Sequence, residues 1–164
     1  MAVLGSGNSN GGCSLLHAAG IGYGASLALD LPVRVRLLDK ESKRTLDDPD
    51  GLLEQVLNAW KNAGHPVPEG ELHWSVKSEI PPRQGLKSSS AISVAAIKAL
   101  CDATGLELEN ADIIDIAAAA QLSAGVSITG SYDDSWAALE GGWKLVDANA
   151  VSYTHLTLPT KRIV

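Results

Sequence analysis

The segment of residues 81–91, PPRQGLKSSSA, constrains the fold of this chain more than any other part of the sequence. It follows residues 72–80, where apolar and polar side chains alternate with the period of a half-buried strand. Gly85 allows a turn, and residues 92–103 place apolar side chains at helical spacing. The sequence therefore predicts a strand, a turn, and a helix that begins within residues 87–90 and ends near Gly105.

Further strands and helices are interleaved along the chain. Residues 33–37 alternate apolar side chains with arginines, which predicts a second half-buried strand, and residues 40–51 have the composition of a charged loop. Apolar side chains at helical spacing predict a helix that starts near Pro49 and stops at Gly64, and Asn110 is expected to cap another helix.

The region after the last of these helices contains two short apolar runs. Val126–Thr129 and Trp143–Val146 are expected to be short strands, and a Gly-Ser-Tyr-Asp-Asp turn is expected to follow the first. Since the elements do not follow a strict β-α-β repeat, the sequence predicts a mixed α+β domain.

Glycines crowd the N-terminal region, and two interpretations of them stay open. Glycine tolerates positive φ and lets backbone turn sharply or approach a ligand closely. Alternatively, residues 1–12 are an unstructured N-terminus. The glycines concerned are Gly5, Gly7, Gly11, Gly12, Gly20, Gly22 and Gly24.

Size, charge and composition exclude several classes of protein. The chain has 164 residues, enough for one ordinary domain, and no Phe, so its core is built from Ala, Val, Leu and Ile. Its net charge of −6 argues against a nucleic-acid surface. No apolar run is long enough to cross a membrane, no secretory signal is present, and Cys13 and Cys101 form no C-x-x-C pair, so we expect a cytoplasmic protein.

The start of the predicted helix at residues 88–90 is a candidate phosphate site. A helix N-terminus offers unpaired N–H groups and a positive dipole end, and serine hydroxyls donate to phosphate or ligate Mg²⁺. The segment is not a Walker loop, because the pattern G-x-x-x-x-G-K-[ST] is missing. The alternative is a polar loop with a serine cap.

Three ordered segments resemble the GHMP small-molecule kinases, and most closely the archaeal-type shikimate kinases. The first is Glu79-Ile80-Pro81 with residues 85–91, GLKSSSA, where a Lys replaces the usual Gly. The second is residues 129–135, TGSYDDS, followed by Gly141-Gly142, and the third, less specific, covers residues 16–31. Together they span most of the chain.

This resemblance implies a fold, a reaction and a set of site residues. The fold is the N-terminal domain of GHMP kinases, a two-layer α/β arrangement like that of a ribosomal protein, with the family's C-terminal ferredoxin-like domain outside this chain. The reaction is ATP-dependent phosphorylation of the 3-hydroxyl of shikimate, with Mg²⁺ as the metal. Ser89 aligns with the Mg²⁺-contacting serine, and Asp134, with Asp133 as the alternative, aligns with the carboxylate that accepts or orients the hydroxyl proton. The ATP-binding residues would be Pro81, Pro82, Arg83, Gln84, Gly85, Leu86, Lys87, Ser88, Ser89, Ser90 and Ala91.

The sequence departs from the family pattern at three positions. Arg83 replaces a common Gly, His17 replaces a common Asn, and Ser123 stands about where related enzymes carry a Glu that helps to hold Mg²⁺. Judged without the resemblance, Asp133 and Asp134 belong to an ordinary polar turn.

Two other functions remain as alternatives to shikimate phosphorylation. One is a GHMP kinase with another acceptor, such as homoserine or mevalonate, and the other is a catalytically silent nucleotide-binding module. We expect small-molecule substrates and neither a nucleic-acid nor a membrane partner.

The last residues differ abruptly in composition from the rest. We interpret residues 1–148 as the domain and residues 149–164 as a non-native tail, like the translated adapter at the end of some environmental gene fragments. The alternative is a native edge strand. If the domain alone is present, the isolated chain is expected to phosphorylate little or no shikimate.

Overall fold

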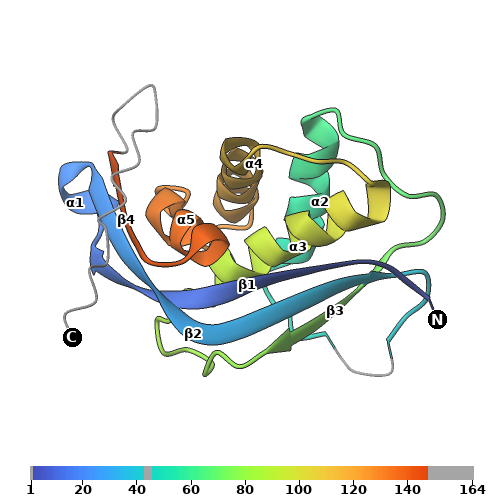
Figure 1. Cartoon of the computed structure of the whole chain (residues 1–164), viewed down its shortest axis with the longest axis horizontal. Helices are drawn as coiled ribbons and strands as arrows, with labels where there is room; N and C mark the ends of the chain where they lie inside the picture. Colours follow the sequence, from blue (N-terminus) through green and yellow to red (C-terminus); the bar gives the residue numbers. More distant parts are fainter. Residues whose placement is uncertain (1, 43–45, 148–164) are drawn as a thin grey trace, which may run out of the picture.

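The computed structural model describes residues 2–42 and 46–147, which form a sheet with helices packed on it (Figure 1). The predicted tail therefore lies outside the described residues. The strands are β1 (Val3–Leu16), β2 (Tyr23–Leu38), β3 (His73–Ser78) and β4 (Trp143–Asp147). The helices are α1 (Ala18–Ile21), α2 (Leu52–Asn62), α3 (Ser88–Thr104), α4 (Asn110–Ser123) and α5 (Tyr132–Glu140). The α+β prediction is confirmed.

The long strand β2 is the centre of the antiparallel sheet. It pairs with β1 along one edge, while β3 pairs with its second half and β4 with its first half on the other edge. The helices α2, α3, α4 and α5 lie together over one face of this sheet (Figure 1). No helix of the described residues is long and apolar enough to span a membrane.

The core lies between the sheet and the helices. The predicted alternation in β2 is confirmed, because Val33, Val35 and Leu37 are fully buried under the helices. Trp60 of α2 is also fully buried, and its indole N–H donates to the carbonyl oxygen of Pro66 at 2.7 Å. Most of the remaining core side chains are alanines and branched aliphatic residues, as the composition predicts.

The glycines of β1 let helix α3 rest directly on the strand backbone. Gly5 and Gly7 pair with Leu37 and Val35, so they face the same side of the sheet as the buried residues of β2. A Cβ at Gly5 or Gly7 would overlap the backbone carbonyl of Ala99 or Ala95. The interpretation of residues 1–12 as an unstructured N-terminus is therefore wrong for the described residues. The glycines allow the backbone of β1 to approach a helix closely.

The repeat of small residues matches between the strand and the helix. Two residues of a strand span about 6.8 Å, and four residues of a helix span about 6 Å. Glycines at every second position of β1 therefore meet alanines at every fourth position of α3. Ser9 continues the series by donating its hydroxyl to the carbonyl oxygen of Ala91 at 2.6 Å. This interface fixes where α3 begins.

Two predicted elements near the C-terminal end are wrong. Val126–Thr129 is irregular rather than a strand, because its Ile128 side chain is 86% exposed and the flanking Gly125 and Gly130 have positive φ. The predicted Gly-Ser-Tyr-Asp-Asp turn is instead the entry to α5, whose first turn contains both aspartates.

The helix starts also differ in detail from the sequence expectation. Helix α2 begins at Leu52, and Asp48 accepts the N–H groups of Leu52 and Leu53 at 2.9 and 3.0 Å. In α4 the cap is Glu109, because the Asn110 amide donates instead to the carboxylate of Glu140 at 2.8 Å. The ends of α3 agree with the prediction.

Candidate active site

The loop between β3 and α3 is anchored to the sheet at both ends. At its start the Glu79 N–H donates to the Pro32 carbonyl at 3.0 Å, and at its end the Gly12 N–H donates to the Leu86 carbonyl at 3.1 Å. Between these anchors the chain adopts positive φ at Arg83 and Gly85, and again at Lys87, the N-cap of α3. Alternation of this kind turns successive N–H groups outward, which is a backbone geometry that binds anions.

The three serines at the start of α3 lie in three different surroundings. Ser88 lines a cavity with Pro82, whereas Ser89 lines another cavity with Lys87. Within the described residues the Ser89 hydroxyl has no hydrogen-bond partner. Ser90 is buried, and its hydroxyl donates to Gln121 of α4 at 2.9 Å. Only Ser89 therefore offers its hydroxyl freely to the cavity beside Lys87.

The cavity beside Lys87, which we name the α3–α5 cavity, has a volume of about 220 Å³. Its lining residues are far apart in the sequence, and they include members of each of the three segments that resemble GHMP kinases. Its lining residues are His17, Lys87, Ser89, Ser90, Gly125, Val126, Ser127, Ile128, Ser131 and Asp134.

The remaining predicted ATP-binding residues lie outside the α3–α5 cavity. Pro81, Pro82, Arg83, Gln84 and Gly85 are exposed in the loop, and Leu86 is half-buried against the core. Ala91 is fully buried and belongs to the core. The structure thus separates the predicted set into an exposed loop, a cavity-lining group and core residues.

Lys87 and Asp134 form an ion pair at the edge of the cavity. The Lys87 Nζ lies 3.0 Å from Asp134 Oδ2, with the lysine side chain 21% exposed and the aspartate side chain 4% exposed. Asp134 Oδ1 accepts hydrogen bonds from the hydroxyls of Ser14, at 3.0 Å, and Ser26. One oxygen of this carboxylate therefore faces the loop, and the other is held by the sheet.

Asp133 lies on the sheet side of the same helix turn. Its Oδ2 atom lies 2.8 Å from the hydroxyl oxygen of Ser26, and a Cβ at Gly24 would lie 2.6 Å from its carboxyl carbon. Burial, and then the charge of Asp134, raise the pKa of Asp133, although Ser26, the Asp133 backbone N–H and Lys87 act against the rise. Gly24 thus leaves the space that a buried carboxyl needs.

Three residues of this arrangement were not identified from the sequence. Ser14 and Ser26 hold the aspartates, and Gln121 joins three helices by accepting from Ser90 and donating to Ser135 at 3.0 Å. A glutamine among the apolar residues of α4 is the one available signal, because a buried amide needs partners. The serines have no such signal, since the aspartates that they contact are more than a hundred residues later in the sequence.

His17 caps the short helix α1, where its Nδ1 accepts from the Ala19 N–H at 3.2 Å, and it also lines the α3–α5 cavity. Among the described residues there is no cluster of three or more His, Cys, Asp or Glu side chains that could hold a metal. A metal here would depend on oxygen atoms from a bound ligand.

A second cavity of about 230 Å³ lies on the other side of the loop. Its lining includes the apolar side chains of Leu46, Trp74, Val76, Ile80 and Ile92. Pro82 and Ser88, which also line it, belong to the loop and the start of α3. The apolar side chains can cover a flat ring, and the adjacent loop can hold the polar groups attached to it.

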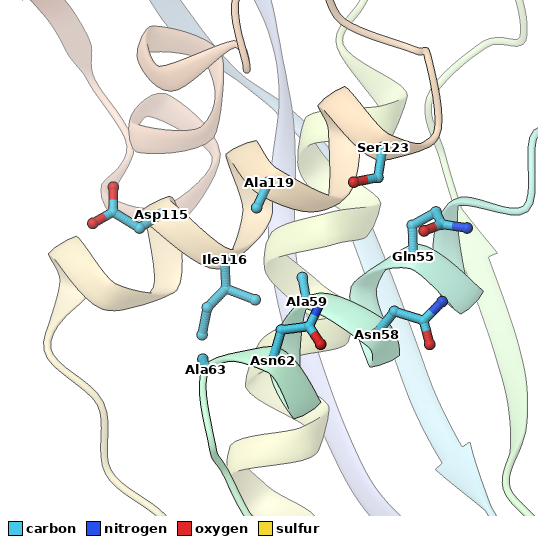
Figure 2. A pocket seen from close by; sticks show the side chains of 9 residues that line it. All are labelled: Gln55, Asn58, Ala59, Asn62, Ala63, Asp115, Ile116, Ala119 and Ser123. Carbon is cyan, nitrogen blue, oxygen red and sulfur yellow. The ribbon is translucent and has the colours of Figure 1, made fainter.

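A third cavity, of about 350 Å³, is a groove between α2 and α4 that shares no lining residue with the α3–α5 cavity (Figure 2). Asn58, Asn62 and Gln55 of α2 line it on one side, and Ser123 and Asp115 of α4 lie on the other (Figure 2). Ser123 therefore lies in this groove and is not among the residues that line the α3–α5 cavity. The side chain of α4 that reaches towards the α3 N-terminus is Gln121.

Comparison with known proteins places the chain among small-molecule kinases. The family model described as GHMP kinases N terminal domain matches residues 51–142, which is more than half of the chain. A curated shikimate kinase of Methanothrix thermoacetophila is 46% identical over 71 residues, 43% of this chain and 25% of that protein. A shikimate kinase of Pyrococcus abyssi is 30% identical over 155 residues, 88% of this chain and 56% of that protein. The chain thus spans about half the length, or less, of these relatives.

Solved structures with the same fold cover nearly the whole chain. A galactokinase of Lactococcus lactis has a TM-score of 0.72 at 17% identity, covering 96% of this chain and 48% of that one. A homoserine kinase of Cytophaga hutchinsonii has a TM-score of 0.65 at 21% identity, and the match covers 97% of this chain and 53% of that one. At these identities the likeness is one of fold.

Proposed function

The chain belongs to the GHMP kinase family as its N-terminal domain, and we propose that the protein, at the length of its relatives, transfers the γ-phosphoryl group of ATP to the 3-hydroxyl of shikimate. The observation that carries the proposal is the meeting of Lys87, Ser89 and Asp134 at one cavity beside the start of α3. Phosphoryl transfer needs neutralised phosphate charge and a positioned hydroxyl, and these residues can supply both.

The loop of residues 79–87 and the first turn of α3 would bind the phosphates of ATP. The unpaired N–H groups of the helix start and the positive φ at Gly85 and Lys87 suit an anion. Lys87 is partly exposed, so its ammonium group can contact phosphate from its place beside Asp134. Arg83, in the same exposed loop, would add a second cation.

The second cavity would hold the adenine ring. It opens next to Pro82 and Ser88, and therefore lies one residue along the helix from the phosphate-facing Ser89. Trp74 and the aliphatic side chains around it offer apolar contact to a planar base. In this arrangement ATP would extend from one cavity to the other across the start of α3.

Mg²⁺ fits the oxygen atoms at this site. Magnesium is held by one or two protein groups together with phosphate oxygens and water, and the free hydroxyl of Ser89 faces the α3–α5 cavity. When bound, Mg²⁺ neutralises charge on the β- and γ-phosphates. Ser89 would be its ligand from this chain.

Asp134 would accept or orient the proton of the acceptor hydroxyl. As that oxygen bonds to the γ-phosphorus, its proton passes to the carboxylate and the bond from phosphorus to the β-γ bridging oxygen breaks, which releases ADP. Asp134 is buried, and Ser14 and Ser26 fix its orientation. A carboxylate held in this way can meet the hydroxyl without reorganising.

Shikimate is proposed as the acceptor because the curated relatives that match across 88% of the chain bear the name shikimate kinase. The test is a comparison of acceptors with the protein at its relatives' full length. ADP release and phosphorylated product are measured with ATP and shikimate, homoserine or mevalonate. We expect turnover with shikimate and not with homoserine or mevalonate.

Either of two results would overturn this proposal. Preferred turnover of homoserine or mevalonate would give the site another acceptor. Binding of ATP without turnover of any acceptor would make the protein a nucleotide-binding module.

A further inference from the structure

The Ser26 hydroxyl has one proton but lies against two carboxyl groups. Its hydroxyl oxygen lies against two carboxyl oxygens, Asp134 Oδ1 and, at 2.8 Å, Asp133 Oδ2. A serine hydroxyl has a single proton and can donate to one of them. The other contact is attractive only if that carboxyl carries a proton of its own.

Ser14 cannot supply the missing proton to Asp133. Its hydroxyl donates to Asp134 Oδ1 at 3.0 Å and lies 3.4 Å from the Ser26 oxygen. Neither contact reaches Asp133. The cluster of Ser14, Ser26, Asp133 and Asp134 therefore needs one more proton than two hydroxyls provide.

The position of Lys87 decides which aspartate holds that proton. The Lys87 Nζ lies 3.0 Å from Asp134 Oδ2, so it favours negative charge on Asp134. Asp133 has no cation within ion-pair distance among the described residues, and both aspartates are buried. A second negative charge beside Asp134 would be costly in this surrounding.

We propose that Asp133 is a neutral carboxylic acid that donates to Ser26, which in turn donates to Asp134, so that Asp134 is the only charged member of the pair. Asp133 is thus a positioning residue for Asp134, and this role deepens the proposed function. With Asp133 neutral, Lys87 and Asp134 have no net charge, and the approaching phosphates meet one carboxylate instead of two.

The two largest influences on Asp133 agree with this assignment. Burial, and then the charge of Asp134, raise the pKa of Asp133, whereas its contact with Ser26, its backbone N–H and the more distant Lys87 lower it. His17 and Asp134 both line the α3–α5 cavity, and Asp133 is not among its lining residues. The absence of a Cβ at Gly24 leaves the space that the Asp133 carboxyl group occupies.

The first test is infrared difference spectroscopy of the chain labelled with ¹³C-aspartate, without nucleotide or acceptor. At about neutral pH the wild type should have a carboxylic-acid C=O band that Asp133→Asn lacks. Asp115→Asn, which changes an exposed aspartate of α4, should keep the band. Absence of this band from the wild type would overturn the proposal.

Ser26→Ala tests the same hydrogen bonds if Asp133→Asn fails to fold. Ser26→Ala retains both aspartates but removes the acceptor for the Asp133 proton, so the carboxylic-acid band should shift or disappear. An unchanged band in Ser26→Ala would overturn the proposed chain of hydrogen bonds.

The pH dependence of unfolding provides an independent readout. A native pKa above the unfolded value of 3.8 stabilises the fold below that pH, and this stability is lost as the pH rises towards the native pKa. As the pH is raised between these two pKa values, the unfolding constant of the wild type should therefore rise relative to that of Asp133→Asn. The expected rise is up to about tenfold per pH unit. A ratio independent of pH would contradict a protonated Asp133. Neither readout uses shikimate or ATP, so a failed kinase assay leaves both interpretable.

Discussion

The two halves of the candidate site meet at one cavity but are held in different ways. Residues 81–85 of the loop of residues 79–87 are exposed, and positive φ at Arg83, Gly85 and Lys87 gives the loop a backbone geometry that suits an anion. The first turn of α5 is buried, and side chains from β1, β2 and the loop fix its aspartates. A loop that recognises phosphate can remain open to solvent, whereas a carboxylate that handles a proton requires a fixed, poorly solvated position.

The largest expected effect is on the buried half. In the protein at its relatives' full length, Asp134→Asn should lower kcat by about two to four orders of magnitude, because an amide cannot accept the hydroxyl proton. ATP affinity, measured by calorimetry, should change by less than about threefold, because in the proposed site the loop and the start of α3 would form most of the phosphate contacts. Equal losses in kcat and in ATP affinity would mean that Asp134 also contributes to ATP binding, so that the two halves do not have distinct roles.

The next largest effect is expected at the contact between the glycines of β1 and helix α3, whose first residues follow the loop. Gly7→Val should destabilise the fold by about 3 kcal/mol, because any side chain at this position overlaps the Ala95 carbonyl of α3. Gly20→Ala is the control, since nothing lies within 4 Å of the added Cβ, and it should change stability by less than about 1 kcal/mol. Urea denaturation measures both, and similar values for the two would show that the strand–helix contact is loose.

A smaller loss is expected where the two halves are joined. Gln121→Leu should cost about 2 kcal/mol in urea denaturation, because it leaves the buried hydroxyls of Ser90 and Ser135 without their partner. Gln55→Leu, on the groove between α2 and α4, should change stability by less than about 0.5 kcal/mol. A Gln121→Leu variant as stable as wild type would remove this link from the account.

The smallest effect is expected at the first turn of α3, which follows the loop. Ser89→Ala should weaken binding of Mg²⁺ and ATP by about fivefold, about 1 kcal/mol, because it removes one hydroxyl among several phosphate and metal contacts. Ser6→Ala, on the exposed side of β1, is the control and should leave binding unchanged. Calorimetric titration compares the two, and an unchanged affinity for Ser89→Ala would place the metal elsewhere.

The same contrast explains what the sequence could predict. The strand, turn and start of α3 follow from local signals, namely the alternation before Pro81, the glycine at position 85 and the apolar residues after Ser90. The entry to α5 was predicted as a turn because Gly130, Ser131 and the aspartates are turn formers. Only packing against the sheet makes these aspartates part of a buried helix.

The glycines of β1 illustrate a related limit. Their spacing of two residues, at Gly5 and Gly7, is visible in the sequence, but it acquires meaning only beside the alanines of α3, about ninety residues later. Ser14 and Ser26 were missed for the same reason, because their partners in α5 are distant in sequence. Local pattern predicted most of the helices and several strands, whereas contacts between distant segments determined the site.

The most direct test of the account is a double-mutant cycle on Lys87 and Asp134, with kcat measured for shikimate phosphorylation by the protein at its relatives' full length. If the two side chains act as one reaction centre, Lys87→Met and Asp134→Asn should each be strongly defective, and the double variant should be about as slow as Asp134→Asn alone. Losses that multiply in the double variant would contradict the account, because they would mean that the Lys87 and Asp134 side chains affect kcat independently of each other.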